Sequence, residues 1–307
     1  MSEAEGSLRA KYLGCMVGSA LGDAIGELAF QHPQESRLRS IIEKTAPLRY
    51  TDDTAMALGL AESLATKRSL DQEHLGRTFH RNYRQEPWRG YAAGPPTIFH
   101  MVEYSGISYA EAARRLFGGE GSFGNGAAMR VAPLGLFFHD APDFYDQAAA
   151  SAAVTHAHPV AQDGAAVQAL AVAQGVKLAP SKPLAGDLFL QELLRFSRTY
   201  ELQRKLRQVQ SLLENQAPCL EAAKALGRSV TIYESLPFAL YAFLKHPQSF
   251  MDCLFCAVLS GGDRDTLGAM AGAVSGAYLG IDAIPAPWRE KLENREPIED
   301  LALSLLR

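Results

Sequence analysis

Two short acidic segments carry the residues best suited to chemistry in this chain of 307 residues. They are YTDDTAMA at 50–57 and SGGDRDTLG at 260–268, and each has two aspartates beside a threonine. A single carboxylate at the start of a helix is an ordinary N-cap, because it accepts hydrogen bonds from free backbone N–H groups. Capping explains two such pairs less well, because massed carboxylates repel each other unless a cation is present. The oxygen donors of the two segments include Thr51, Asp52, Asp53, Asp263, Asp265 and Thr266.

The chemistry of these side chains selects the class of cation. All the donors are oxygens, and no cysteine or histidine lies at comparable spacing. Oxygen donors favour a hard ion such as Mg²⁺ or Mn²⁺ over zinc. If the two acidic segments meet in the fold, they could hold two metal ions.

A glycine-rich segment, GGEGSFGNGAAMRVAPLGLFF at 118–138, predicts a loop that runs into a helix. Free backbone N–H groups in such a loop suit a phosphate, and Phe123 is placed to stack on a base. The alternative is a flexible surface loop, because glycine richness alone is weak evidence. A second loop, RGYAAGPPT at 89–97, also has small residues and an aromatic. His156 and His158 precede a helical pattern, and each is either structural or part of a ligand site.

Apolar residues recur at helical spacing almost throughout the chain, and alternating β-branched runs are missing. We therefore expect an all-α fold with one domain that covers residues 1–307. A surface loop is expected at 177–186. Besides the two glycine-striped helices described next, helical stretches are expected at 54–66, 72–84, 109–117, 144–153, 160–176, 187–197, 201–214, 219–227, 234–245, 249–259 and 298–306.

Two of the expected helices carry glycines at intervals of four residues. They are Gly14, Gly18 and Gly22 in one helix and Gly268, Gly272 and Gly276 in the other. Glycine in a helix interior costs about 1 kcal/mol relative to alanine, so each stripe needs a reason. A row of small residues lets another backbone approach closely. We infer two central helices that are close-packed on their glycine faces, with packing against each other as one arrangement.

Composition excludes several classes of protein. A formal net charge of only −4 gives no electrostatic case for nucleic acid or an anionic membrane. The N-terminal segment lacks the basic and apolar regions of a signal peptide, and we expect no apolar stretch long enough to span a bilayer. We therefore expect a cytoplasmic protein. Cys253 and Cys256 are expected to be buried, inert thiols, because their C-x-x-C lies in an apolar helical run and lacks a second ligand pair at zinc spacing.

Five segments, in their order along the chain, closely resemble the ADP-ribosylglycohydrolase family: GSALGDAIGE, YTDDTAMA, GSFGNGAAMRVAPLG, THAHP and GGDRDT. The resemblance spans residues 11–280, and RNYRQEPWRGYAAG, GSFGNGAAMR and YESLPFALYAFL are most similar to the third type of ADP-ribosyl-acceptor hydrolase. It implies a compact, orthogonal bundle of α-helices with a centre of two Mg²⁺ ions. It also implies removal of ADP-ribose from serine and breakdown of O-linked poly(ADP-ribose) or O-acetyl-ADP-ribose. The partner would be an ADP-ribosylated protein or a small molecule that contains ADP-ribose, and we expect a monomer.

The family motifs carry over to individual positions of this chain. The TDDT and GGDxDT motifs match metal ligands at the six candidate positions named above. Gly94 matches a small residue in a ligand-facing loop, and His156 matches a histidine near the ADP-ribose. The candidate catalytic residues are Glu27, Asp53 and Asp263. The loop that wraps the diphosphate and the adenosine side matches Gly121, Ser122, Phe123, Gly124 and Asn125.

Two positions depart from the family pattern. Arg264 stands where threonine or alanine is common, and its side chain is expected to point outward or to reach the acceptor side of the cleft. The serine-type enzymes have a mobile glutamate seven residues after the aspartate that matches Asp23, and here that position is Phe30. Glu27 either replaces this glutamate or leaves the lid absent. The alternatives to a serine-type enzyme are an arginine-specific N-glycosidic hydrolase and a non-catalytic ADP-ribose-binding relative.

Overall fold

The described chain consists of helices and the loops that connect them. The computed structural model describes residues 3–306, which contain seventeen α-helices, three short 3₁₀-helices and no β-strand. The expected all-α fold is therefore confirmed over this range. The α-helices are α1 (Glu3–Gln31), α2 (Glu35–Lys44), α3 (Asp52–Lys67), α4 (Gln72–Gln85), α5 (Gly94–Ser105), α6 (Tyr109–Arg115), α7 (Ala132–Phe137), α8 (Phe144–Ala153), α9 (Pro159–Lys177), α10 (Gly186–Phe196), α11 (Tyr200–Glu214), α12 (Cys219–Leu226), α13 (Ile232–Lys245), α14 (Phe250–Leu259), α15 (Arg264–Leu279), α16 (Ala286–Lys291) and α17 (Arg295–Ser304). The 3₁₀-helices are η1 (Phe117–Gly119), η2 (Asn125–Ala127) and η3 (Ile281–Ala283).

The positions of the helices follow the apolar periodicity of the sequence. A helix is present at every stretch for which bounds were expected, and its ends lie within three residues of those bounds. The expected loop separates α9 from α10. The sequence analysis did not anticipate α2, α5 and α16. The start of α5 was assigned to a loop because Gly94 is followed by two prolines. Proline is accepted in the first turn of a helix because its missing N–H has no partner there in any case.

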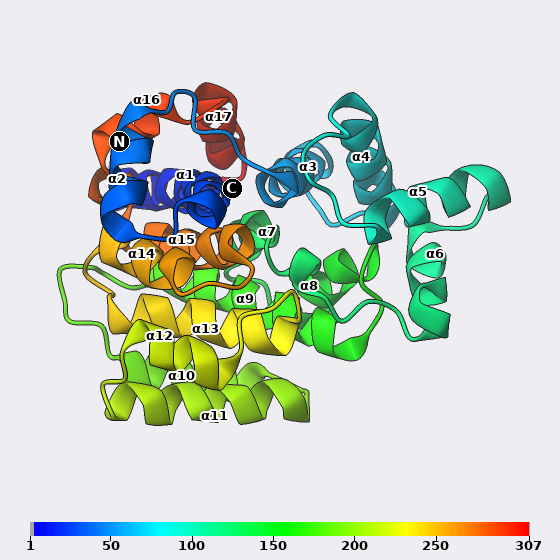
Figure 1. Cartoon of the computed structure of the whole chain (residues 1–307). Helices are drawn as coiled ribbons and strands as arrows, with labels where there is room; N and C mark the ends of the chain where they lie inside the picture. Colours follow the sequence, from blue (N-terminus) through cyan, green and yellow to red (C-terminus); the bar gives the residue numbers. More distant parts are fainter. Residues whose placement is uncertain (1–2, 307) are drawn as a thin grey trace.

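The two glycine-striped helices, α1 and α15, lie side by side at the centre of the fold and run in opposite directions (Figure 1). A Cβ atom built on the glycines of α1 would lie only 2.0–2.6 Å from the facing carbonyl oxygens of α15. No side chain fits in that space, so the inferred packing of the two glycine faces on each other is confirmed. The facing pairs are Gly14 with Gly276, Gly18 with Gly272 and Gly22 with Gly268.

The remaining helices are arranged around this central pair. α9, α13 and α14 pack against α15, and α10, α11 and α12 form an outer layer beyond α13 (Figure 1). α4, α5 and α6 pack together at the far side of α3 (Figure 1). The start of α3 and the loops that follow α4 and α6 are thereby carried toward the ends of the central helices. The candidate site lies there.

α1 passes a length and composition test for a membrane span, contrary to the expectation that no stretch is long enough. The segment Glu5–Gln31 is long and apolar enough to cross a bilayer, but 78% of its most apolar window is buried inside the structure. A helix in the core of a protein passes the same test, because both environments demand apolar residues on all sides. The result is therefore weak evidence of a membrane span.

One of these two cysteines differs from the expectation of inert thiols. Cys256 in α14 forms a disulfide with Cys219 at the start of α12, with their Cα atoms 5.5 Å apart. Cys253 is free and buried, as expected, and Cys15 is also free and buried. The pairing could not be read from the sequence, because a separation of 37 residues gives no hint that α12 and α14 lie together.

Replacement of Gly272 by alanine tests the central contact. The new Cβ would lie 2.2 Å from the carbonyl oxygen of Gly18, so the two helices must move apart. We expect the free energy of unfolding to fall by at least about 2 kcal/mol, measured by urea denaturation, despite the higher helix propensity of alanine. The control is Gly186→Ala in α10, where the nearest atom to the new Cβ is a Leu244 methyl at 3.7 Å. Equal stability of the two variants would contradict the assignment.

Candidate metal centre and cavity

Asp23 on α1 joins the first acidic segment to the central helices. Its fully buried carboxylate accepts hydrogen bonds of 2.8–3.0 Å from the N–H and hydroxyl of Thr51. It also accepts bonds of 3.0 and 2.6 Å from the N–H and hydroxyl of Thr54. Thr51 is the N-cap residue of α3, yet its own side chain makes no capping hydrogen bond. Asp23 therefore caps α3 from another helix and holds the TDDT segment against α1.

The start of α15 brings the second acidic segment to the same place. Asp263 is the N-cap residue of α15, and Asp265 lies in its first turn. The close contact with α1 extends to this point, since a Cβ on Gly26 would lie 2.5 Å from Asp265 Cα. Asp263 Oδ2 accepts a hydrogen bond of 2.7 Å from Asn125 Nδ2, which ties it to the glycine-rich loop. The two acidic segments therefore meet, and we call Asp23, Asp52, Asp53, Asp263 and Asp265 the acidic centre.

The carboxylates of the acidic centre disfavour one another's charge. Burial, and after it the neighbouring carboxylates, raises the pKa of Asp52 to about 7 and that of Asp265 to about 8. The same two causes raise the pKa of Asp53 well above its usual range. Burial raises the pKa of Asp23 to about 6, although its hydrogen bonds act in the opposite direction. A cation among these groups would reverse the effect, because it favours their charged forms.

One oxygen atom of the acidic centre lacks a partner within the protein. Asp53 Oδ1 is buried and lacks a hydrogen-bond partner, and it is the only carboxylate oxygen in that condition among the described side chains. An unpaired buried carboxylate oxygen is costly, and a cation would supply its missing partner. The surrounding groups are carboxylates and threonine hydroxyls. Such a donor set fits Mg²⁺ or Mn²⁺ and does not favour a thiophilic metal.

A cavity of about 440 Å³ opens beside the acidic centre. Four aspartates of the acidic centre line the cavity together with Thr266, namely Asp52, Asp53, Asp263 and Asp265. The three loops singled out in the sequence, near 90, 120 and 156, supply most of the remaining wall. Their lining residues are Gly90, Ala92, Ala93, Gly94, Ser122, Gly124, Asn125, Gly126, Thr155 and His156, and Pro95, Phe117, Val230, Met56 and Met129 complete the wall.

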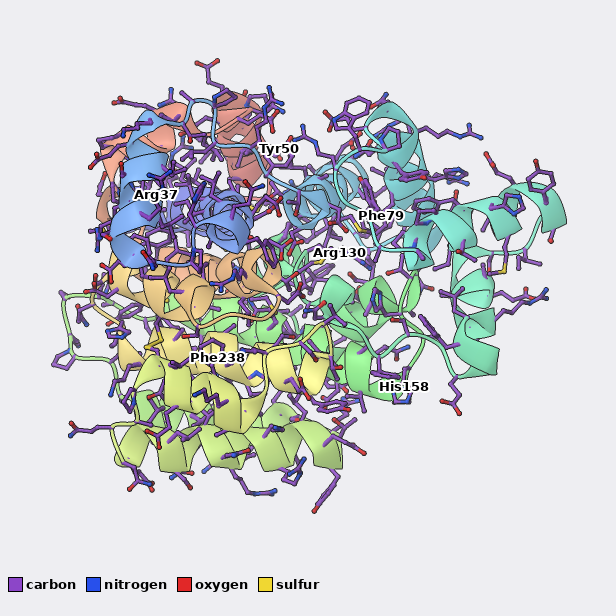
Figure 2. All side chains as sticks on the ribbon, viewed as in Figure 1. Arg37, Tyr50, Phe79, Arg130, His158 and Phe238 are labelled. Atoms are coloured by element: carbon purple, nitrogen blue, oxygen red, sulfur yellow. A yellow bond between two sulfur atoms is a disulfide. The ribbon has the colours of Figure 1, made fainter. Side chains whose placement is uncertain are left out.

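His156 and the glycine-rich loop fit against each other. A Cβ on Gly126 would lie 2.9 Å from His156 Cε1, so only glycine allows the ring this position. Burial, helped by the nearby Arg130 charge, lowers the pKa of His156 to about 3, so the ring is neutral at physiological pH. Its Nδ1 lies 2.8 Å from the hydroxyl of Thr155. The fully buried Arg130 guanidinium lies 4.7 Å from the centre of the Phe79 ring, and Figure 2 labels both residues.

A second hollow, of about 460 Å³, adjoins the cavity at the acidic centre. Asp52, Gly90 and Asp265 line both spaces. Buried Arg89 supports this wall, because it donates a 3.0 Å hydrogen bond to the Tyr50 carbonyl and forms ion pairs with two glutamates. The other lining residues are Glu27, Arg49, Tyr50, Thr51, Trp88, Arg89 and Glu293.

Two residues of the glycine-rich loop, Gly121 and Phe123, lie outside the cavity lining. Gly121 packs against the segment before α9, where a Cβ would lie 2.8 Å from Ala157 Cβ. The exposed ring of Phe123 stands edge-on to His158, with 5.7 Å between the ring centroids. Phe117, which the sequence analysis did not single out, is the aromatic residue of the lining. Successive residues of the loop therefore alternate. Ser122 and Gly124 line the cavity, whereas Gly121 and Phe123 lie outside the lining.

The structure also gives the positions of other residues, some of which the sequence analysis did not single out. Glu27 and Thr51 line the second hollow and not the cavity. The Arg264 guanidinium donates a hydrogen bond to the Val258 carbonyl on α14, so it does not extend to the acceptor side. The roles of Asp23 and Arg130 were missed, although GSALGDAIGE and GNGAAMR were both recognised as motifs. Neither motif shows which buried partner its charged residue meets.

Comparisons with known proteins agree along the whole chain. A family model described as ADP-ribosylglycohydrolase matches residues 4–307. ADP-ribosylhydrolase ARH3 of Mus musculus is 34% identical over 97% of this chain and 91% of its own length. ADP-ribosylhydrolase ARH3 of Homo sapiens is also 34% identical, over 97% of this chain and 93% of its own length. A solved structure named ADP-ribosylglycohydrolase-related protein complex is 27% identical, with a TM-score of 0.75 and 98% of both chains covered.

The raised pKa values predict how stability depends on pH and Mg²⁺. An aspartate with a folded pKa of 6–8 binds more protons when folded than when unfolded between about pH 4 and 8, so stability falls as pH rises through that interval. In EDTA, we expect the melting temperature to fall by at least about 5 °C from pH 5 to pH 8. Millimolar Mg²⁺ should restore more of it at pH 8 than at pH 5.

Asp53→Asn is the matched variant for this test. It removes the carboxylate that has the unpaired buried oxygen, so we expect a weaker dependence on pH and a smaller response to Mg²⁺. Asp187→Asn, at an exposed position at the start of α10, should behave like the wild type. A melting temperature in EDTA that stays constant from pH 5 to 8 would refute the electrostatic account of the acidic centre.

Proposed function

Because this chain belongs to the ADP-ribosylglycohydrolase family of hydrolases, we propose that it is a Mg²⁺-dependent enzyme that removes ADP-ribose from O-linked, serine-type acceptors. The observation that carries the proposal is the position of the acidic centre where two spaces adjoin. A glycosidic bond held there would have its ADP-ribosyl side in the cavity and its acceptor side in the second hollow. Poly(ADP-ribose) and O-acetyl-ADP-ribose are further O-linked substrates of the same kind.

The residues that would hold the metal are those of the two acidic segments. Asp53 offers an unpaired buried oxygen, and Asp263 is fixed by the Asn125 amide. Bound Mg²⁺ would position the ribose hydroxyls and lower the pKa of a water molecule. The proposed ligands of two such ions are Thr51, Asp52, Asp53, Asp263, Asp265 and Thr266.

The cavity wall supplies binding that is remote from the reacting bond. Ser122, Gly124 and Asn125 of the glycine-rich loop line the part of the cavity proposed for the diphosphate, and the exposed Phe117 ring is available to stack on an adenine. Neutral His156 contributes an uncharged part of the cavity wall, and it does not attract the phosphate as a cation would. Binding at this distance from the bond that breaks helps to hold the ribose in a reactive position.

Two glutamates line the proposed acceptor side, and Glu293 forms an ion pair with Arg89, so Glu27 is the candidate for proton transfer. It is exposed and lines the second hollow with Asp52 and Asp265. Hydrolysis passes through an oxocarbenium-like state, adds a hydroxyl to the anomeric carbon and delivers a proton to the departing acceptor oxygen. Glu27 is placed to move that proton. The exposed Phe30 lies at the position of the family lid glutamate, so Glu27 is the proposed substitute.

The assay that tests the function compares two acceptors. Release of ADP-ribose is measured from matched serine-linked and arginine-linked peptides, in Mg²⁺ and in EDTA. We expect release from the serine-linked peptide only, with at least a hundredfold loss in EDTA or in Asp53→Asn, about the rate effect of losing one charge-stabilising group. Asp187→Asn should retain full activity.

Other results of this assay would change the assignment. Release from the arginine-linked peptide alone would identify an N-glycosidic hydrolase. The exposed Glu27 carboxylate favours this alternative, because it could pair with a guanidinium. Binding of ADP-ribose without release from either peptide would indicate a non-catalytic relative. Undiminished release in EDTA would rule out the metal-dependent mechanism.

The two adjoining spaces should have separable roles. Phe117→Ala should raise the Kd for ADP-ribose about tenfold, because stacking of a base on an aromatic ring contributes roughly 1–3 kcal/mol. Glu27→Gln should leave that Kd within about twofold and lower kcat about a hundredfold, since it removes a proton-transfer group. Calorimetry and the peptide assay measure the two effects. Phe123→Ala is the control for Phe117, and a larger effect of Phe123 on affinity would show that the adenine lies outside the cavity.

A further inference from the structure

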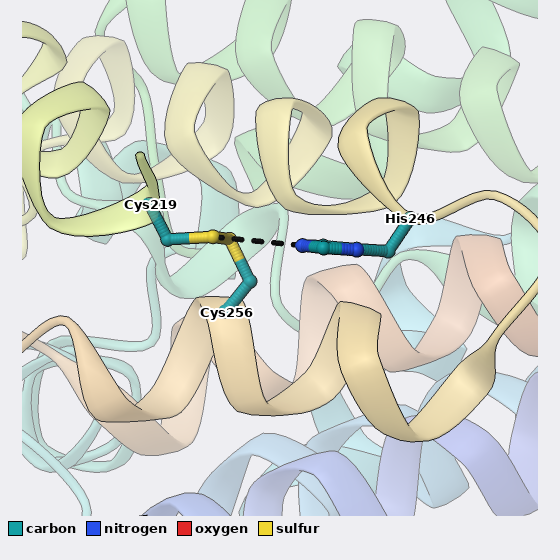
Figure 3. Close-up of side chains that lie close together, drawn as sticks. All are labelled: Cys219, His246 and Cys256. Carbon is teal, nitrogen blue, oxygen red and sulfur yellow. Dashed lines mark hydrogen bonds between the residues drawn. A yellow bond between two sulfur atoms is a disulfide. The ribbon is translucent and has the colours of Figure 1, made fainter. Parts of the chain in front are cut away.

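A compact cluster of sulfur and nitrogen atoms lies away from the acidic centre. It consists of Cys219 at the start of α12, Cys256 in α14 and His246, the residue that follows α13 (Figure 3). One potential ligand atom from each residue lies within 4.8 Å of the others. No other group of at least three histidine, cysteine, aspartate or glutamate side chains within residues 3–306 meets this test. The two sulfur atoms are joined in a disulfide.

The geometry of the cluster is close to that of a tetrahedral metal site. His246 Nε2 lies 3.7 Å from Cys219 Sγ. With Zn–S bonds of about 2.3 Å and a Zn–N bond of about 2.0 Å, a tetrahedral centre separates sulfur from nitrogen by about 3.5 Å. The histidine is therefore close to the required distance from Cys219. The two sulfur atoms must separate, and a break in their bond allows it.

The surroundings also leave room for ligation. Cys219 and His246 are each partly exposed, so solvent can reach the cluster and supply a fourth ligand. The two remaining cysteines are unsuitable, because Cys15 and Cys253 are fully buried and burial raises the pKa of both thiols.

We infer that Cys219, Cys256 and His246 form a second metal site, one that binds Zn²⁺ or a similar thiophilic cation when the disulfide is reduced. Two equivalents of a thiol break the Sγ–Sγ bond and leave two protein thiols and the disulfide of the reductant. Zn²⁺ then binds both sulfurs as thiolates and releases their two protons. In an oxidising environment the disulfide links α12 to α14, and in a reducing one the metal does so.

This site is chemically distinct from the acidic centre. Thiolate and imidazole select zinc-like cations, whereas the carboxylates select hard ions such as Mg²⁺. α14 is followed directly by the turn that carries Asp263, so either form of the cluster anchors the element that precedes the acidic centre. Metal binding at the cluster can nevertheless be measured without any enzyme assay.

The test uses Co²⁺ as a spectroscopic probe of thiolate ligation in the full chain. The protein is reduced with a phosphine, freed of it under nitrogen and titrated in excess Mg²⁺. We expect one Co²⁺ per chain with a thiolate charge-transfer band, displaced by an equimolar amount of Zn²⁺. The oxidised chain should give no band. Cys219→Ser and Cys256→Ser should each abolish it, and His246→Gln should weaken binding more than about tenfold, since even outer-shell partners contribute that much.

Controls separate this site from the acidic centre and from misfolding. Cys253→Ser and Asp53→Asn should leave the band unchanged, and circular dichroism should show that each variant is helical. In the reduced wild type, Zn²⁺ should slow alkylation of Cys219 and Cys256 at least about tenfold, as peptide mass spectrometry would show. Absence of the band in the reduced wild type, or its survival in both serine variants, would overturn the inference.

Discussion

The contact between the backbones of α1 and α15 determines where the acidic residues of this protein lie. Three pairs of facing glycines bring the two helices so close that no side chain fits between them. Because the helices are antiparallel, the end of α1 that carries Asp23 lies beside the start of α15, with Asp263 and Asp265. The helix propensity lost at the glycines is offset by this close packing, which fixes the acidic centre from one side.

Asp23 extends the same constraint to a third helix. Its carboxylate takes the place of the missing side-chain cap of α3, so the TDDT segment cannot move independently of the central pair. The result is five buried or partly buried carboxylates, and burial together with the neighbouring carboxylates raises the pKa values of Asp52, Asp53 and Asp265. Such a cluster is unfavourable for the protein alone and suited to a cation. The clustered carboxylates therefore explain both the unfavourable electrostatic energy of the protein alone and the proposed binding of metal ions.

Much of this arrangement could be read from the sequence, and the exceptions have physical reasons. Helical periodicity located most helices, but α5 was hidden because glycine and two prolines are also typical of loops. The ordered motifs indicated which segments form the site. They did not show that Phe117 enters the cavity while Phe123 meets His158, because the orientation of a loop residue depends on the segment it packs against.

The sequence by itself determined the all-α class, the two close-packed glycine faces and the family, because periodicity, small-residue stripes and motif order are local properties of the chain. Only the tertiary structure decided which groups are neighbours across long separations. It placed Asp23 on the amides of α3, Asn125 on Asp263, and Cys219 beside Cys256 and His246. Such contacts depend on how helices pack in three dimensions, and no spacing along the chain records that packing.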